Sequence, residues 1–201
     1  MSSNFRITLA APEAVAQIEK SAPQTLKNHF ELIKEGLTFI PGVPREAVFG
    51  AVTLRALALK PDIFTSWFLT EYHSVKQGEI DTKTKELLAF IISKENEGNE
   101  CAACAPYHEA AARFEGATPE ETLAAHDFAS SAHLLPQTTR TLIEFGLKAA
   151  FRPKEITDQD VSNVKSHGIS DKGLIELAST ALIAYNLSAL NQIFNLKEGE
   201  G

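Results

Sequence analysis

The spacing of apolar residues is the feature that most restricts how this chain can fold. Apolar side chains recur every three or four positions along most of the 201 residues, which is the repeat that gives an α-helix one apolar face. The alternation typical of a half-buried strand is nearly absent. We therefore expect an all-α fold. The predicted helical segments are Ala47–Leu59, Phe64–Val75, Lys83–Ser93, Pro106–Phe114, Glu120–Ser131, Thr138–Ala149 and Leu174–Ile193.

Capping and breaking residues divide these helices. Thr118-Pro119-Glu120-Glu121 has a capping threonine, a proline at the first helical position and acids in the first turn, and Thr157–Asp160 opens another helix in a similar way. Prolines in the segments 41–44 and 152–153 break the helical pattern. We predict a single compact domain with three parts: an N-terminal helical extension (1–40), a half that carries both cysteines (41–135), and a second helical half without cysteines (136–201).

Charge and composition exclude several classes of protein. The net charge is −7, and the basic residues are scattered, so the chain lacks the basic stripe of a nucleic-acid-binding protein. The first twenty residues contain Glu13 and Glu19 and do not resemble a secretory signal or a transit peptide. No apolar stretch approaches the length of a membrane span. We therefore expect no nucleic acid, no membrane and a reducing cytoplasmic compartment, where a close cysteine pair is typical of catalysis or metal binding.

The sequence also contains a weak internal repeat. Asp81–Ser93 resembles Asp171–Ala184, and continuing the alignment puts Asn191 at the position of Cys101 and Phe194 at that of Cys104. This similarity predicts two related helical halves, of which only the first carries a CxxC motif. A chance similarity between two capped amphipathic helices is the alternative.

The two cysteines lie where a helix begins. Cys101, Cys104 and His108 are spaced by three and four residues, so they share one helical face. If Asn99 caps this helix, Cys101 lies in its first turn, where free backbone N–H groups and the helix dipole favour a thiolate. His108 can then accept the thiol proton of Cys104.

Glu86 is the candidate partner of His108. Two antiparallel helices joined by a turn centred near Glu97 would bring Glu86 and His108 level with each other. Glu86, His108 and Cys104 would then form a proton relay. The alternative for Glu86 is a solvated acid in the first turn of its helix.

An acid that opens an apolar helix, followed by a polar turn and C-x-x-C-x-x-x-H, resembles the alkylhydroperoxidase D-like (AhpD-like) branch of the carboxymuconolactone decarboxylase family. The segments from Arg55 to Pro61 and from Glu155 to Asn186 are also similar to the peroxidase-related members, so the resemblance covers roughly Gly42 to Leu196. It implies an AhpD-like helical bundle, a thiol peroxidase or disulfide reductase activity, and a homo-oligomer.

The resemblance also implies roles for individual residues. Cys104 would be the peroxidatic thiol, Cys101 the resolving thiol of a redox-active disulfide, His108 the base and Glu86 the distal proton relay. The substrate would be an alkyl hydroperoxide, reduced in an antioxidant role. We expect no cofactor, because flavin, haem and nucleotide motifs are absent, so an external dithiol or protein thiol must supply electrons.

Several alternatives remain open at this point. The CxxC with His108 has ligand types for zinc, although a second ligand pair is missing, and two buried cysteines can also simply pack. On the same scaffold, a carboxymuconolactone decarboxylase-like enzyme would use His108 and Glu86 for proton transfer on a lactone acid. A non-catalytic redox sensor is the third functional hypothesis.

A few other polar residues receive structural interpretations. His73, beside Glu71, is expected on a helix surface, and Glu71 itself receives no role. Asn186 and Asn191 lie in an otherwise apolar helix, and we interpret them as hydrogen-bonding groups at a subunit contact or as the polar spacing of a half-exposed helix.

Overall fold

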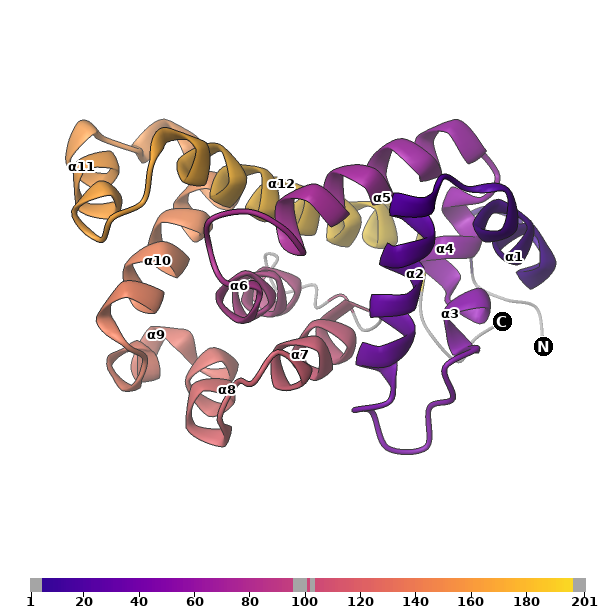
Figure 1. The fold of residues 1–201 in the computed structure, drawn as a ribbon, viewed down its shortest axis with the longest axis horizontal. Coiled ribbons are helices and arrows are strands. Elements are labelled where there is room, and N and C mark those ends of the chain that lie inside the picture. The colour runs from indigo at the N-terminus through magenta and orange to yellow at the C-terminus, as the bar shows by residue number, and fades with distance from the viewer. Residues whose placement is uncertain (1–4, 96–100, 102–103, 197–201) are drawn as a thin grey trace.

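The computed structural model describes residues 5–95, 101 and 104–196. Within these residues the chain forms α-helices and two short 3-10 helices and contains no strand, which confirms the all-α prediction (Figure 1). The predicted turn near Glu97 and the predicted cap at Asn99 lie outside the described residues. In chain order the α-helices are α1 (Pro12–Ser21), α2 (Gln24–Leu37), α3 (Ala47–Gly50), α4 (Val52–Leu57), α5 (Pro61–Val75), α6 (Thr82–Glu95), α7 (Cys104–Phe114), α8 (Pro119–His126), α9 (Phe128–Ser131), α10 (Gln137–Phe151), α11 (Asp158–Ser166) and α12 (Asp171–Phe194).

Two predicted helices are broken in the structure. Ala51 takes a non-helical conformation and separates α3 from α4, and Asp127 does the same between α8 and α9. Apolar spacing continues across both breaks, so periodicity alone does not reveal them. The two expected caps are present as complete capping boxes, one at Thr118 with Glu121 and one at Thr157 with Asp160.

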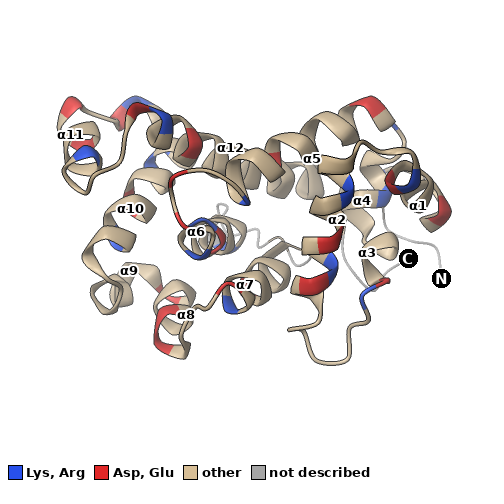
Figure 2. Ribbon diagram, in the orientation of Figure 1, with Lys and Arg blue, Asp and Glu red and all other residues tan. Residues whose placement is uncertain are grey.

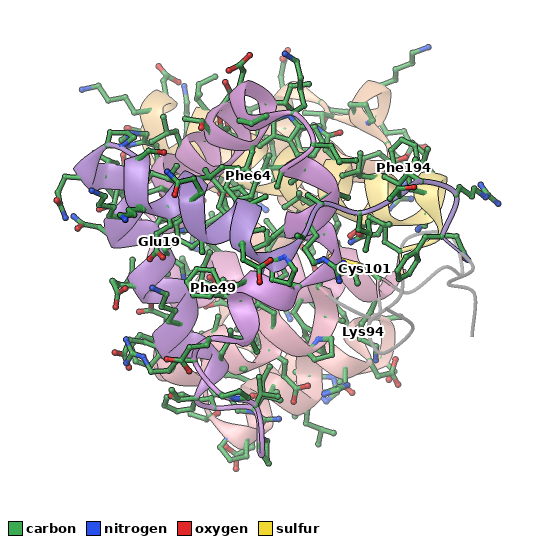
Figure 3. All side chains as sticks on the ribbon, turned by 90° about the vertical axis from the view of Figure 1, so that its right-hand side faces the viewer. Glu19, Phe49, Phe64, Lys94, Cys101 and Phe194 are labelled. Carbon is green, nitrogen blue, oxygen red and sulfur yellow. A yellow bond between two sulfur atoms is a disulfide. The ribbon has the colours of Figure 1, made fainter. Side chains whose placement is uncertain are left out.

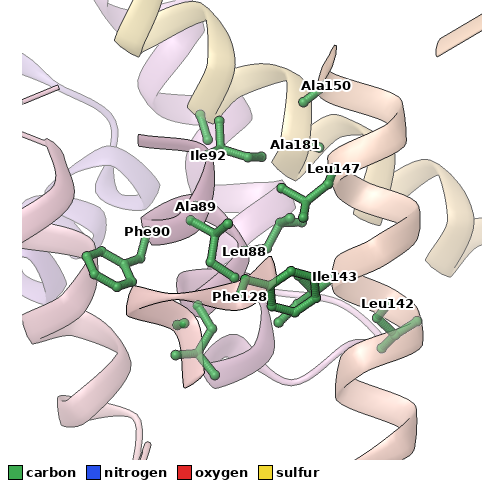
Figure 4. Close-up of a cluster of buried hydrophobic side chains, with 14 of the residues drawn as sticks. Leu88, Ala89, Phe90, Ile92, Phe128, Leu142, Ile143, Leu147, Ala150 and Ala181 are labelled. Carbon is green, nitrogen blue, oxygen red and sulfur yellow. The ribbon is translucent and has the colours of Figure 1, made fainter. Parts of the chain in front are cut away.

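Helix α6 is the centre of the larger hydrophobic cluster. Its residues from Leu87 to Ile92 are all buried, and they pack against α10 and α12 (Figure 4). Close packing with α10 depends on Gly146, because a Cβ at this position would overlap the Leu88 side chain. Leu88, Ile143 and Phe128 belong to this cluster and are among the residues labelled in Figure 4. A helix buried on all sides in this way fixes the position of any polar group that it carries.

A second hydrophobic cluster joins the N-terminal helices to α5. Phe30 of α2 stacks on Phe64 and Phe68 of α5. Ile183 and Leu187 of α12 belong to this cluster, whereas Leu177 and Ala181 of the same helix belong to the larger one. Helix α12 therefore connects the two ends of the molecule, as Figure 1 shows.

The expectation that no apolar stretch approaches the length of a membrane span is wrong for α12. By length and composition alone it could cross a membrane, but 44% of its most apolar window is buried inside the fold. Acidic and basic residues are interspersed along the helices (Figure 2).

Candidate functional site

Cys101 and Cys104 form a disulfide, with their Cα atoms 5.3 Å apart. Cys104 is the first described residue of α7, and Cys101, labelled in Figure 3, precedes it and is not helical. The carbonyl of Cys101 accepts hydrogen bonds from the backbone N–H groups of Cys104 and Ala105, so Cys101 precedes the first turn. The prediction that Cys101 lies in the first turn is therefore wrong, and Cys104 takes that place.

The two sulfurs differ in access. Cys101 is 2% exposed, and its backbone N–H donates to the Ser93 carbonyl near the end of α6. Cys104 is half-buried and lines a cavity of about 410 Å³. A molecule that enters the cavity therefore meets Cys104 and not Cys101.

Asn191 of α12 contacts both sulfurs, which the sequence analysis missed. Its buried side-chain amide Nδ2 donates to Cys101 Sγ at 2.9 Å and to Cys104 Sγ at 3.2 Å. Thr53 of α4 donates to Asn191 Oδ1 at 2.7 Å and so fixes which end of the amide faces the sulfurs. The interpretation of Asn191 as a group at a subunit contact or on a half-exposed helix is corrected, whereas Asn186 is exposed. The alignment of Asn191 with Cys101 in the internal repeat was the available signal.

Glu86 and His108 meet between α6 and α7. Glu86 Oε2 lies 2.7 Å from His108 Nδ1, and both side chains are buried. Glu86 Oε1 accepts a hydrogen bond from the buried Lys76 Nζ at 2.5 Å. The structure thus brings together the acid and the imidazole that the hairpin register predicted, and Glu86 is not a solvated acid. It also adds Lys76, which the sequence analysis did not consider.

The charge state of Glu86 follows from these neighbours. Burial acts to raise the pKa of the Glu86 carboxyl, but the Lys76 charge and the His108 hydrogen bond outweigh it and lower the pKa to about 2. A carboxylate that stays ionised accepts a hydrogen bond from the His108 ring and orients it. His108 also lines the cavity that Cys104 lines.

Glu71 of α5 is a second buried acid near the site that sequence reasoning missed. Its Oε2 lies 3.5 Å from Nε2 of His29 in α2, and Glu71 lines the same cavity as Cys104. A signal was available in the sequence, because Glu71 continues the spacing of Phe64 and Phe68 along the buried face of α5. His73 is exposed, as expected.

The remaining cavity wall is mostly apolar. Its residues come largely from α2, α3, α4 and the segment between α2 and α3, and they include Ile33, Leu37, Ile40, Val48 and Leu54. Tyr107 also lines the cavity, and its hydroxyl is buried without a hydrogen-bond partner among the described residues. Burial and the nearby acids, Glu86 first, raise the pKa of Tyr107 well above its usual value, so the hydroxyl keeps its proton.

The arrangement of possible metal ligands bears on the zinc alternative. Among the residues that the structure describes, no group of three or more His, Cys, Asp or Glu side chains is arranged to bind a metal ion.

The chain is similar to a known protein family and to several solved structures. Residues 61–145 match the carboxymuconolactone decarboxylase family. No curated protein matches the chain. Among solved structures, the fold is similar to the alkylhydroperoxidase AhpD core of an uncharacterized peroxidase-related protein from Ralstonia eutropha JMP134, with 18% identity and a TM-score of 0.69 over 98% of this chain and 93% of that one.

Two further structures share the fold. An uncharacterized peroxidase-related protein from Silicibacter sp. TM1040 is 17% identical, with a TM-score of 0.63 over 88% of this chain and 85% of that one. A cysteine-to-alanine variant of the debrominase Bmp8, in complex with 2,3,4-tribromopyrrole, is 19% identical, with a TM-score of 0.65 over 90% of this chain and 89% of that one. The chain therefore carries a carboxymuconolactone decarboxylase family segment at residues 61–145 within the AhpD-like all-helical fold.

Proposed function

We propose that this protein is a thiol-dependent peroxidase that reduces organic hydroperoxides through Cys101 and Cys104. One observation carries the proposal: Cys104 and His108 line the same cavity, and the disulfide partner Cys101 is buried behind Cys104. This is the arrangement that a peroxidatic cysteine needs, because its sulfur must meet both substrate and base while the resolving sulfur stays within bonding distance.

The first half-reaction oxidises Cys104. His108 accepts the thiol proton, and the Cys104 thiolate attacks the terminal peroxide oxygen of R–O–OH. An S–O bond forms, the O–O bond breaks, and the proton goes from His108 to the departing alkoxide to give an alcohol. Cys104 is left as a sulfenic acid. Glu86, ionised beside Lys76, stabilises the imidazolium that exists between the two proton transfers.

The second half-reaction forms and then reduces the disulfide. The Cys101 sulfur attacks the Cys104 sulfenic acid, so that an S–S bond forms and water leaves with the thiol proton. An external dithiol or protein thiol then reduces the disulfide by thiol exchange, and it enters through the cavity at Cys104. The Asn191 amide, which donates to both sulfurs, stabilises the thiolate that each exchange step releases.

The proposal includes the setting of this reaction. A disulfide that cycles requires a reducing compartment such as the cytoplasm, without a membrane or nucleic acid as partner. We also propose a homo-oligomer, as the resemblance to the family implies. The described surface includes large apolar side chains on α12, among them Ile175 and Ile193, which fits such an assembly.

The choice of electrophile is the finer part of the proposal. One structural neighbour is a debrominase, so this fold is found with chemistry other than peroxide reduction. Decarboxylase-like proton transfer on a lactone acid would need His108 and Glu86 but neither sulfur. The hydrogen bonds of Asn191 to both sulfurs favour thiol chemistry, because proton transfer alone gives the amide nothing to stabilise there.

The test is peroxide turnover with cumene hydroperoxide and dithiothreitol. Cys104→Ser abolishes turnover in this proposal, whereas Cys101→Ser leaves a sulfenic acid that a dimedone probe traps on Cys104 and mass spectrometry locates. Turnover that survives Cys104→Ser contradicts the proposal. If a Cys104→Ser variant still consumes peroxide and the probe traps a sulfenic acid on Cys101, then Cys101 is the peroxidatic cysteine and Cys104 the resolving one.

A further inference from the structure

The Glu71 carboxylate of α5 is a buried acid without an assigned role. It belongs to the wall of the cavity that Cys104 and His108 line, but the peroxidase mechanism above gives it no step. It is 6% exposed, and its one direct polar contact among the described residues is with His29 Nε2 at 3.5 Å. A buried carboxylate normally accepts several hydrogen bonds. Glu71 thus keeps acceptor capacity on a surface that faces the cavity.

The charge of Glu71 also favours a role as a hydrogen-bond acceptor in the cavity. Burial acts to raise the pKa of this carboxyl, but the nearby His29 and His108 outweigh it and lower the pKa below its usual value. Glu71 is therefore an anion at neutral pH. An anion in an apolar wall favours a ligand that donates a hydrogen bond, and it opposes a ligand that carries its own negative charge.

The rest of the cavity limits the size and polarity of that ligand. A volume of about 410 Å³ suits a small organic molecule, and the walls from α2, α3 and α4 are apolar. These helices lie before residue 61, outside the segment that matches the family. The residues of this wall can therefore change, and the ligand preference with them, without a change in Cys104 or His108.

We propose that this cavity is a binding site for neutral, mostly apolar molecules whose single N–H or O–H group donates a hydrogen bond to Glu71. Glu71 and Cys104 line the same cavity, so a ligand held at Glu71 shares this space with the Cys104 sulfur. This inference rests on the proposed function for the identity of the reacting sulfur, but the binding preference does not depend on turnover. It excludes fatty-acid-like and lactone-acid ligands, because their carboxylates would face the Glu71 anion.

Three matched probes test the preference on the oxidised, full-length protein by isothermal titration calorimetry. 4-Ethylphenol has a donor, ethylbenzene lacks one, and 4-ethylbenzoate carries a negative charge. We expect 4-ethylphenol to bind about tenfold more tightly than either of the others, since a hydrogen bond to a buried charged group has about this value. Equal affinities for the three probes, or tighter binding of 4-ethylbenzoate, overturn the proposal.

Variants then assign the preference to Glu71. Glu71→Gln keeps the side-chain size and removes the charge, and we expect it to reduce the difference between 4-ethylphenol and 4-ethylbenzoate to about threefold or less. Glu120→Gln, at an exposed acid on α8, is the matched control and leaves the order of the three affinities unchanged. A difference between 4-ethylphenol and 4-ethylbenzoate that stays near tenfold in Glu71→Gln overturns the proposal. If Glu71→Gln does not fold, the probe series on the unaltered protein still decides.

The two proposals fail in different ways. A protein that binds the probes in the expected order but reduces no hydroperoxide retains the Glu71 site and refutes the peroxidase function. A protein that reduces hydroperoxides without discriminating among the probes retains the function and refutes the Glu71 site.

Discussion

Glu86 of α6 and Glu176 of α12 lie at matching positions in the two segments that resemble each other, and each accepts a hydrogen bond from a buried lysine. Lys76 Nζ lies 2.5 Å from Glu86, and Lys85 Nζ lies 2.6 Å from Glu176. The two carboxylates differ in the other groups that they contact. Glu86 Oε2 contacts His108, whereas the oxygens of Glu176 accept the backbone N–H groups of Glu79 and Ile80. An acid paired with a lysine thus contacts an imidazole in one place and holds a loop in the other.

The two segments differ again after these acids. Helix α6 ends at Glu95 and α7 begins at Cys104, whereas α12 continues without a break to Phe194. The unbroken helix carries Asn191 to the sulfurs of the other segment. A helix start provides thiols with free N–H groups nearby, and a continuous helix provides a rigid support for one amide. The comparison therefore predicts that Glu86 acts on chemistry, Glu176 on stability and Asn191 on the redox couple.

The largest expected effect follows from Glu86→Gln. Without the charge, His108 loses the group that stabilises its imidazolium form, and we expect kcat/KM for the hydroperoxide to fall about 1,000-fold. Steady-state kinetics with a dithiol reductant, normalised to folded protein by circular dichroism, measure this loss.

Glu176→Gln is the matched control for that variant. It removes the charged acceptor of Lys85 and of two backbone N–H groups, so it should lower the free energy of unfolding by about 2 kcal/mol. Its kcat/KM should stay within about threefold of the unaltered protein, since Glu176 touches neither sulfur nor His108. Equal losses of kcat/KM in Glu86→Gln and Glu176→Gln would show that both acids are structural. They would refute the assignment of Glu86 to catalysis and Glu176 to stability.

The next largest expected effect is the pH-dependent contribution of Glu86 to the free energy of unfolding. The pKa of the Glu86 carboxyl is about 2 in the folded protein, compared with an ordinary value of 4.5. Ionised Glu86 therefore stabilises the folded state relative to the unfolded state. This stabilisation is fully present above pH 4.5 and is lost as the pH falls toward 2, with a total of about 3 kcal/mol. Urea unfolding at a series of pH values measures it. The same series on Glu86→Gln should fall less steeply below pH 4.5, and parallel curves would contradict the assignment.

The smallest expected effect concerns Asn191. Its amide stabilises a thiolate more than a disulfide sulfur, so it favours the reduced pair. Asn191→Ala should lower the midpoint potential of the Cys101–Cys104 couple by about 30 mV, which corresponds to about 1.4 kcal/mol. Thr53→Val frees the amide to rotate and should give a smaller shift in the same direction. Redox titration against glutathione measures both, and a potential that rises in Asn191→Ala would refute this role.

Much of the fold was predictable from the sequence because helical spacing is a local property. The helices from α5 to α7 and helices α10 and α12 lie where the apolar repeat predicts them, and both capping boxes form from residues three apart. The breaks at Ala51 and Asp127 were not predictable in the same way. They depend on how the short helices pack against the rest of the molecule.

In the candidate site, too, some features follow from local helical geometry and others depend on how separate helices pack. The sequence by itself determined that Cys104 and His108 share one face of a helix and that Glu86 comes level with His108, because both follow from helical geometry and from one hairpin. The tertiary structure alone decided that Asn191 contacts the sulfurs, that Lys76 pairs with Glu86 and that Glu71 faces the cavity. Those contacts depend on how separate helices pack, and the burial of apolar faces, which sets that packing, leaves no local pattern around the polar residues that it brings together.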